Sequence, residues 1–325
     1  MQKLEEIGFY SLSDKRAKNV SWKSDLQRCE LILTDRCNFK CLYCRGIKKE
    51  LQGDLTLKQA KEIIDIWVSG NIHNIRFSGG EPTIWKDLVE LVKYTKSFSC
   101  IEHIALSTNG SASLEFYKYL YKLGVNDFSI SLDACCSSMA NIMAGTNANF
   151  EHITNIIKEL SKLTYVTVGV VLDKQNNSDL KNIISYATSL GVSDIRIIPS
   201  SQSNHYLNID DIKTDYGILS YRLNNIKNKR HVRGITEKDC KKCHLVKDDM
   251  AILHGKHFPC VIYMREQGKS IGTIYNKTLT EIKKERKKWF EKTNTYNDPI
   301  CRKNCLDVCI DHNNKVEYFL NKKDE

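Results

Sequence analysis

The feature that most restricts the fold is the regular alternation of short apolar runs with helical patterns between residues 30 and 200. The runs have the length of strands, and the segments between them repeat apolar residues at helical spacing. Strands that alternate with helices of about 10–15 residues form parallel βαβ units. The predicted strands are Glu30–Thr34, Asn74–Ser78, His103–Ser107, Asp127–Leu132, Tyr165–Leu172 and Asp194–Ile198.

Helix start and stop signals support the same alternation. Thr56 and Asp179 are residue types that begin helices, and Gly70, Gly124 and Gly191 are placed to end them. The predicted helices are Leu57–Val68, Leu88–Phe98, Ser113–Leu123, Phe150–Leu163 and Asp179–Leu190. The pattern predicts an α/β fold with parallel units, and in such folds ligands bind at the carboxyl ends of the strands.

The composition indicates a globular chain in a reducing compartment. Of the 325 residues, 41% are hydrophobic and 27% are charged, which is ordinary for a folded domain. No apolar run approaches the roughly 20 residues that span a bilayer, so we expect no membrane partner. Met1–Asp14 lacks the apolar core of a secretory signal. The 13 cysteines therefore indicate a cytoplasmic protein that ligates metal, rather than a disulfide scaffold.

The net charge of +10 is spread along the chain, with one dense run at Lys283–Lys288. Beside Ile282, Trp289 and Phe290, this run predicts the solvated face of an amphipathic helix. The alternative is attraction of an anionic substrate such as a nucleotide, a sugar phosphate or an acidic peptide. No array of base-stacking aromatic residues accompanies the charge, so we expect no dedicated nucleic-acid binding.

Three cysteines crowd one short segment, in the spacing Cys37-x3-Cys41-x2-Cys44. Three thiolates so close together can bind three irons of a 4Fe–4S cube, whereas most cubes take four protein thiolates. The fourth iron would then stay open for an exchangeable ligand. Structural zinc is the alternative, because tetrahedral zinc also takes clusters of cysteine.

A second motif, Ser78-Gly79-Gly80-Glu81-Pro82, follows at the end of the second predicted strand. Two successive glycines permit close backbone approach to a ligand, and Glu81 can accept hydrogen bonds from an ammonium group. The two motifs in this order resemble the signature of the radical S-adenosylmethionine (SAM) superfamily, in which an aromatic residue, here Tyr43, precedes the third cysteine.

This resemblance implies a partial (β/α)6 TIM-like barrel over residues 29–200 and a 4Fe–4S cluster whose open iron binds SAM. The reduced cluster then cleaves SAM to methionine and a 5′-deoxyadenosyl radical, which abstracts a hydrogen atom from the substrate. The residues expected to contact SAM or substrate are Tyr43, Ser78, Gly79, Gly80, Glu81, Pro82, Thr108, Asn109, Ser131, Asp133 and Gly169.

The last five of these residues belong to further strands, four of them at strand ends and Gly169 on the fifth strand. Thr108 and Asn109 close the third strand, where Asn109 equally suits a simple turn. Ser131 and Asp133 share one face of the fourth strand, and polar residues inside a barrel are costly unless they bind something. Ser131 is expected at the SAM ribose. Gly169 would leave room for adenine, or would mark a bulge.

Six more cysteines lie near the C-terminus: Cys240, Cys243, Cys260, Cys301, Cys305 and Cys309. Cys243-x11-Gly255-x4-Cys260 resembles the opening of SPASM and shorter twitch domains, which append auxiliary 4Fe–4S clusters to radical SAM barrels. The spacing predicts a hairpin that turns at Gly255. The run from Cys301 to Cys309 departs from the full SPASM pattern, although residues four apart on a helix share a face.

Six thiolates cannot ligate two cubes, which need eight, so we expect one auxiliary cluster. Its expected ligands are Cys243, Cys260, Cys305 and Cys309, with Cys240 and Cys301 as alternates. Structural zinc, through Cys240, Cys243 and two later cysteines, is the alternative. The expected organisation is a lead-in over 1–28, a barrel over 29–200, a linker with one helix over 201–235, and a small cluster domain over 236–325.

Cys135 is the candidate catalytic residue. It shares the inward parity of Asp133, so its thiol could return a hydrogen atom to a substrate radical, as in family epimerases. A free cysteine is more often an inert apolar residue, because reactivity needs a special site. The cluster domain is the more specific signal, and it favours oxidation of the substrate over epimerisation.

The resemblance implies a SAM-dependent enzyme that draws electrons from a reductant such as flavodoxin or ferredoxin. Its substrate would be a peptide or protein residue, or a carbohydrate or nucleotide-like small molecule. The alternative is a non-catalytic module that binds zinc or an iron–sulfur cluster. The Ser78–Pro82 motif argues against this alternative. Thr34–Phe39 also resembles the cluster loop of the GTP cyclase of molybdopterin synthesis, but that family's C-terminal cysteine pattern and Gly-Gly tail are missing.

Overall fold

The structure is a computed structural model that describes residues 10–45, 53–201, 209 and 212–322. Within them, nine strands form one sheet in the order β6-β5-β4-β3-β2-β1-β7-β8-β9. Neighbouring strands from β6 to β7 pair in parallel, and β8 pairs antiparallel with β7 and β9. The strands are β1 (Arg28–Ile32), β2 (Asn74–Ser78), β3 (His103–Thr108), β4 (Asp127–Ser131), β5 (Tyr165–Leu172), β6 (Asp194–Pro199), β7 (Asp249–Leu253), β8 (Lys256–Phe258) and β9 (Gly272–Thr273).

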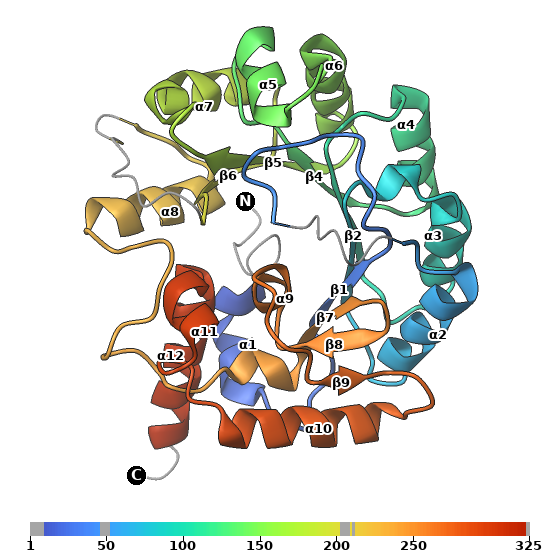
Figure 1. The fold of residues 1–325 in the computed structure, drawn as a ribbon, viewed down its shortest axis with the longest axis vertical. Helices are drawn as coiled ribbons and strands as arrows, with labels where there is room; N and C mark the ends of the chain where they lie inside the picture. The colour runs from blue at the N-terminus through green and yellow to red at the C-terminus, as the bar shows by residue number, and fades with distance from the viewer. Residues whose placement is uncertain (1–9, 46–52, 202–208, 210–211, 323–325) are drawn as a thin grey trace.

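The helices follow the strands in the chain, and α2 to α7 line the outer side of the curved sheet (Figure 1). The α-helices are α1 (Asp14–Asn19), α2 (Leu57–Val68), α3 (Leu88–Lys96), α4 (Leu114–Leu123), α5 (Ser137–Ala144), α6 (Phe150–Ser161), α7 (Leu180–Ser189), α8 (Gly217–Lys227), α9 (Val261–Arg265), α10 (Leu279–Lys292), α11 (Pro299–Asn304) and α12 (Asp307–Asn321). Short 3₁₀ turns cover Tyr10–Leu12, Pro82–Ile84, Asn177–Asp179 and His244–Lys247.

The predicted α/β fold with a partial (β/α)6 barrel is confirmed. Strands β1 to β6 stand side by side in chain order, each joined to the next through helical segments. Thr56 caps α2 with a complete capping box, in which its hydroxyl accepts from the Gln59 N–H. Gly124 ends α4 in the left-handed conformation, at φ 117°. The start and stop signals in the sequence therefore act as predicted at these positions.

The core lies between the sheet and its outer helices. Every second strand residue, such as Leu31, Phe77 and Phe128, is buried on that side, where Trp67 of α2 and Tyr117 of α4 meet them fully buried. Removing a large apolar side chain from water contributes about 1.5–3 kcal/mol to folding. The alternate strand residues face the inside of the barrel, and many of them are polar.

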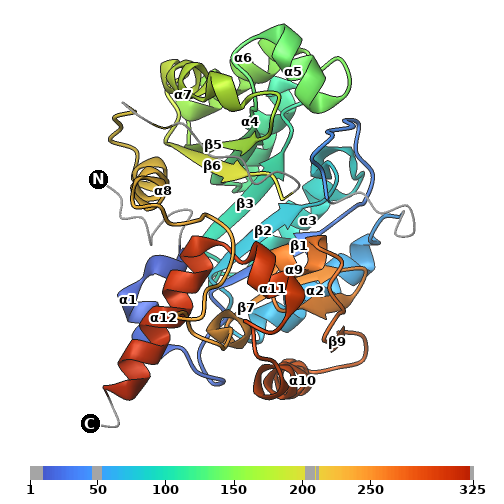
Figure 2. The same ribbon diagram turned by 60° about the vertical axis from the view of Figure 1, so that its left-hand side comes forward.

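The C-terminal segment extends the barrel sheet. β7 pairs in parallel with β1, and the β7–β8 hairpin turns at His254 and Gly255, both left-handed at φ 47° and 67°. The predicted hairpin at Gly255 is confirmed. In Figure 2 the helices α9, α10 and α11 gather beside this hairpin. The expected cluster domain, residues 236–325, thus shares a sheet with the barrel. Its boundaries stay a prediction.

The flanking segments also pack on this side. In the lead-in, α1 packs along α12, and Arg16 forms a buried ion pair with Asp248 at 2.7 Å. The linker contains α8 as its one described helix; residues 202–208 and 210–211 of the linker lie outside the described residues. None of the described helices is long and apolar enough to cross a membrane.

The basic run Lys283–Lys288 lies on α10, as predicted, but its face is not wholly solvated. Ile282 and Arg286 are buried, and the Arg286 guanidinium donates to the carbonyl oxygens of Val246, Phe258 and Asp249. Arg286 therefore fastens α10 to the hairpin. Lys284, Lys287 and Lys288 form the exposed face, whereas the half-buried Lys283 donates to Ser24 O at 2.9 Å.

Candidate active site

A cavity of about 380 Å³ occupies the inside of the barrel. Side chains of alternate strand residues line it, including Arg28 and Glu30 of β1, Arg76 of β2, Ser129 of β4 and Arg196 of β6. Buried polar groups are costly unless they are paired or bind a ligand. A barrel interior lined by such side chains therefore indicates a binding site.

The three cysteines of the loop after β1 face this cavity together, because Cys37, Cys41 and Cys44 all line it. The Phe39 N–H donates to Cys37 Sγ at 3.4 Å, and Asn109 Nδ2 lies 3.9 Å from the same sulfur. Burial raises the pKa of the Cys37 thiol, and it raises that of Cys41 to about 12. Metal binding must displace these protons. Three thiols on one wall fit the predicted three-ligand cluster.

The glycine pair of Ser78–Pro82 packs against this cysteine loop. The Gly80 N–H donates to Thr34 O and the Glu81 N–H to Arg36 O, both at 2.8 Å. A Cβ atom at Gly80 would lie 2.1 Å from Arg36 O. The sequence predicted close approach to a ligand, whereas the structure shows that the backbone of the cysteine loop already requires glycine here. Gly79 and Gly80 also line the cavity.

Glu81 holds strand ends together instead of lining the cavity wall. Its carboxylate is fully buried and accepts from the Thr83 N–H at 3.1 Å, from the Thr83 and Thr108 hydroxyls at 2.7 Å, and from the Asn109 N–H at 2.7 Å. Burial raises the pKa of the Glu81 carboxyl. The geometry does not support the expected contact with a SAM ammonium group, because the protein itself supplies these four donors. Pro82, buried at the start of a 3₁₀ turn, is likewise absent from the described residues that line the cavity.

Replacing Glu81 with glutamine should therefore lower the stability of the protein without SAM. An amide cannot accept from both sides, so a buried donor loses its partner at a cost of about 1–3 kcal/mol. Thermal unfolding of the ligand-free protein measures this, with Glu90→Gln on the exposed face of α3 as the control. Unchanged stability together with weaker SAM binding would show that Glu81 contacts SAM after all.

Tyr43 and Asp133 meet at the cavity wall. The Tyr43 hydroxyl donates to Asp133 Oδ2, and the Val171 N–H donates to Asp133 Oδ1 at 2.6 Å. Burial raises the pKa of the Asp133 carboxyl to about 6. Both residues line the cavity, as do Ser131, Thr108 and Asn109. These positions agree with the expectation that they face a ligand.

Gly169 lines the cavity without any bulge. Gly169 pairs in regular register with Ser131, the last residue of β4, and with Arg196 in β6, where the pairing continues on both sides of it. A Cβ atom there would lie 3.6 Å from the nearest atom, in Arg196, which is ordinary contact. The missing side chain therefore leaves space in the cavity rather than relieving a clash.

Five C-terminal cysteines converge on a second, smaller cavity: Cys243, Cys260, Cys301, Cys305 and Cys309. Burial raises the pKa of the Cys243, Cys260 and Cys301 thiols, that of Cys260 to about 12. The pKa of the Cys305 thiol is also raised, first by a hydrogen bond with Cys309 and then by burial. The structure thus brings together the four expected cluster ligands and the alternate Cys301. Cys240, the other alternate, is not among the described residues that line this cavity.

Cys260 and Cys309 line the central cavity as well. The two cysteine groups therefore stand on different walls of one cavity: the loop after β1 carries the first group, and α9 and α12 border the second.

Cys135 does not belong to this wall. It lies between the end of β4 at Ser131 and the start of α5 at Ser137, packed partly buried against the core, and it is not among the described residues that line the cavity. The parity argument fails because the chain leaves the strand conformation after Ser131. The structure therefore gives no support to Cys135 as a hydrogen-atom donor.

The sequence interpretation missed the arginines of the barrel interior. Arg76 pairs with Asp127 at 3.0 Å, whereas no described carboxylate forms an ion pair with Arg196. Arg196 donates to Ser129 Oγ at 3.0 Å, its buried Nε has no partner, and burial next to Arg76 and Arg28 lowers its pKa to about 10. The two-residue period of the strands, which places Arg76 with Ser78, would have shown that these arginines point inward.

Comparison with protein families gives a match over residues 31–187 to the Radical SAM superfamily. A probable GTP 3′,8-cyclase of Sulfurisphaera tokodaii is 26% identical over 176 residues, which cover 53% of this chain and 56% of that protein. A GTP 3′,8-cyclase of Staphylococcus epidermidis is 31% identical over 166 residues, 47% and 48% of the two chains. The chain spans about half the length of the curated relatives it matches.

Several solved structures share the fold. Streptococcus suis SuiB bound to precursor peptide SuiA has a TM-score of 0.60 at 14% identity, over 90% of this chain and 69% of SuiB. The structure of anSMEcpe with bound AdoMet has a TM-score of 0.61 at 13% identity, over 91% of this chain and 97% of anSMEcpe. The structure of BtrN in complex with AdoMet and 2-DOIA has a TM-score of 0.53 at 16% identity, over 89% of this chain and 96% of BtrN.

Proposed function

We propose that this chain, whose residues 31–187 match the Radical SAM superfamily, cleaves SAM reductively and oxidises an anionic substrate held in the barrel cavity. The observation that carries the proposal is that both cysteine groups line one cavity, the first through Cys37, Cys41 and Cys44, the second through Cys260 and Cys309. A substrate in this cavity would lie between the two groups.

Cys37, Cys41 and Cys44 would hold a 4Fe–4S cluster with one iron left for SAM. When bound and reduced, this cluster supplies the electron that splits SAM into methionine and the radical that takes a hydrogen atom from the substrate. Gly79, Gly80, Ser131 and Gly169 border the space that SAM would fill. Asn109 would hold the cysteine loop through Asn38, to which its amide donates at 2.8 Å. A reductant such as flavodoxin or ferredoxin would act with it in the cytoplasm.

Four of the five thiols in the second cavity would hold an auxiliary 4Fe–4S cluster. The auxiliary cluster would supply an electron acceptor next to the substrate. Because Cys135 does not line the central cavity, we favour this oxidation over epimerisation through a donor thiol.

The arginines support an anionic substrate. Arg196, Arg233 and Arg265 line the cavity. Arg265 lies 3.7 Å from Glu30 in an ion pair, whereas Arg233 donates to the carbonyl oxygens of Pro199 and Asn304 and forms no ion pair with a described carboxylate. Burial next to Arg222 lowers the pKa of Arg233 to about 10. A bound phosphate or carboxylate would offset these buried charges. The peptide bound in the SuiB structure and the nucleotide in the cyclases' name illustrate two sources of such groups.

The Arg196→Met variant tests the substrate class. We expect phosphorylated small molecules or acidic peptides, and not their neutral analogues, to raise the thermal stability of the SAM-loaded wild-type protein. A charge-assisted hydrogen bond is worth about 1.5–3 kcal/mol, so the variant should bind the stabilising anion about tenfold to a hundredfold more weakly. Arg302→Met, on the exposed face of α11, is the matched control. Full affinity in the Arg196 variant, or stabilisation by neutral analogues alone, contradicts the proposal.

A further inference from the structure

Cys240 stands apart from the five clustered thiols, in a group with His244 and Glu317. One ligand atom of each, the Cys240 sulfur, a His244 ring nitrogen and a Glu317 oxygen, lies within 4.8 Å of the other two. Glu317 Oε1 is 3.4 Å from Cys240 Sγ and 3.1 Å from His244 Nε2. We propose that these three residues bind a zinc ion, separate from both iron–sulfur sites.

The distances fit tetrahedral zinc. Bonds of about 2.3 Å to sulfur and about 2.0–2.2 Å to nitrogen and oxygen place neighbouring ligand atoms about 3.3–3.6 Å apart. The Sγ–Oε1 distance of 3.4 Å lies within this range, and the Nε2–Oε1 distance of 3.1 Å lies slightly below it. A mixed set of thiolate, imidazole and carboxylate ligands also suits zinc better than calcium or magnesium, which take oxygen ligands.

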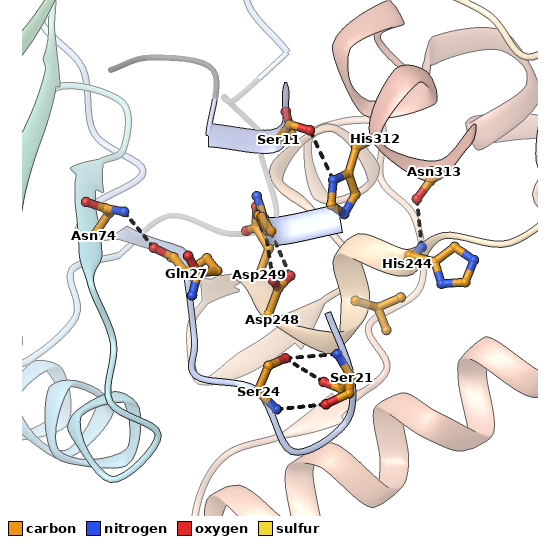
Figure 3. Close-up of polar contacts among 12 residues, drawn as sticks. Ser11, Ser21, Ser24, Gln27, Asn74, His244, Asp248, Asp249, His312 and Asn313 are labelled. Atoms are coloured by element: carbon orange, nitrogen blue, oxygen red, sulfur yellow. Dashed lines mark hydrogen bonds and ion pairs between the residues drawn. The ribbon is translucent and has the colours of Figure 1, made fainter. Parts of the chain in front are cut away.

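Helix α12 fixes the segment that carries two of the ligands. The Asn314 side chain accepts from the Cys240 N–H, and the Asn313 side chain accepts from the His244 N–H, both at 2.7 Å. Figure 3 shows Asn313 at the backbone of His244, with the imidazole ring turned away from that contact. Glu317 lies one turn further along the same helix. Such supporting hydrogen bonds orient the ligands of metal sites.

The individual side chains are also set for binding. Cys240 Sγ accepts from the Lys242 N–H at 3.3 Å, the same kind of contact that Phe39 makes with Cys37. The His244 side chain is 3% exposed, and its ring packs edge-on against the Phe290 ring with 5.3 Å between the ring centroids. Its Nε2 atom faces Glu317. These contacts hold the thiol and the imidazole in the positions that a shared ion requires.

The charge around the group is compatible with a divalent cation. A thiolate and a carboxylate would neutralise zinc, and the imidazole is a neutral ligand. Two lysines act electrostatically on the group, Lys247 on Glu317 and Cys240, and Lys241 on Cys240. The Lys247 amine lies over the Phe290 ring, 5.2 Å from its centroid, and the Lys241 amine lies over the Tyr296 ring at 4.6 Å. Glu317 is 40% exposed, so water can complete the coordination from the solvent side. The ion would tie α12 to the segment that leads into Cys243.

Metal analysis of the reconstituted full-length protein tests this site. After incubation with zinc sulfate and desalting, we expect about one zinc per wild-type chain. Cys240→Ser and Glu317→Gln should each lose the zinc while iron and sulfide stay at the wild-type level. Cys136→Ser, which alters an exposed cysteine outside the group, should retain the zinc. Because Glu317 is partly exposed, its substitution tests the site even if the Cys240 variant folds poorly.

Zinc-edge X-ray absorption then identifies the ligands. The expected spectrum has one sulfur neighbour at about 2.3 Å and nitrogen or oxygen neighbours at about 2.0–2.1 Å. Absence of zinc from the wild-type protein would overturn the proposal, as would several sulfur neighbours, which would place the zinc among the five clustered thiols. Loss of iron from Cys240→Ser would also overturn it, because Cys240 would then be a cluster ligand.

Discussion

Replacing Cys37, Cys41 and Cys44 together with alanine should lower the iron content of the reconstituted protein from about eight to about four per chain. The three thiols line the central cavity. The other described cysteines that line it, Cys260 and Cys309, belong to the C-terminal group. The loop itself should stay in place, because Thr34 O and Arg36 O accept from Gly80 and Glu81. The remaining iron and sulfide should belong to the C-terminal group.

Iron and acid-labile sulfide assays on protein purified without oxygen measure this loss. Cys100→Ala is the matched control, because Cys100 lines neither described cavity. An unchanged iron content in the triple variant would mean that these cysteines hold no cluster.

Substitution of the C-terminal ligands should have a comparably large effect on a different property. Cys243→Ala or Cys260→Ala should remove the second set of about four irons and destabilise the region around α9 to α12, because metal-binding energy is largely folding energy in small metal sites. SAM cleavage at the first cluster should persist. Iron analysis and limited proteolysis measure the two effects.

Cys301→Ala refines the same experiment. Five thiols line the cavity where a cube needs four, so loss of the surplus thiol should leave the iron content unchanged. Cys301 is taken as the surplus thiol because the sequence predicted it only as an alternate ligand. The expected ligands Cys305 and Cys309 are four residues apart near the start of α12. Zinc in place of iron and sulfide in this cavity would make it a structural zinc site.

The barrel could be predicted because local signals and periodicity agree with the final packing. The bounds of β2, β5 and α2 match the prediction. β1 was predicted two residues too late, since the charged Arg28 faces the cavity and hides the start of the apolar run by which a strand is recognised. Helix α5, at Ser137–Ala144, was missed because it is short and begins with two serines.

Non-local pairing could not be predicted in the same way. The parallel contact of β7 with β1 joins residues more than 200 positions apart, and nothing in either strand specifies its partner. The ion pair between Arg16 and Asp248 depends on that contact, so α1 appeared in the sequence only as a lead-in.

The site shows the same division between spacing and environment. Spacing alone predicted that Cys37, Cys41 and Cys44 act together, and all three do line one cavity. It could not reveal that the protein already surrounds Glu81 with donors, or that the chain turns away from the cavity before Cys135. Ser78, Gly79 and Gly80 of the motif expected to bind SAM do line the cavity, while the role of its acidic residue depends on burial that only the structure shows.

The central claim is tested most directly by measuring 5′-deoxyadenosine. Reconstituted wild-type protein, reduced with dithionite and incubated with SAM, is analysed by mass spectrometry beside the Cys37, Cys41 and Cys44 triple variant. We expect stoichiometric or greater 5′-deoxyadenosine from the wild type and none from the variant. Absence of 5′-deoxyadenosine from wild-type protein that contains both clusters, or equal amounts from the two proteins, would contradict it.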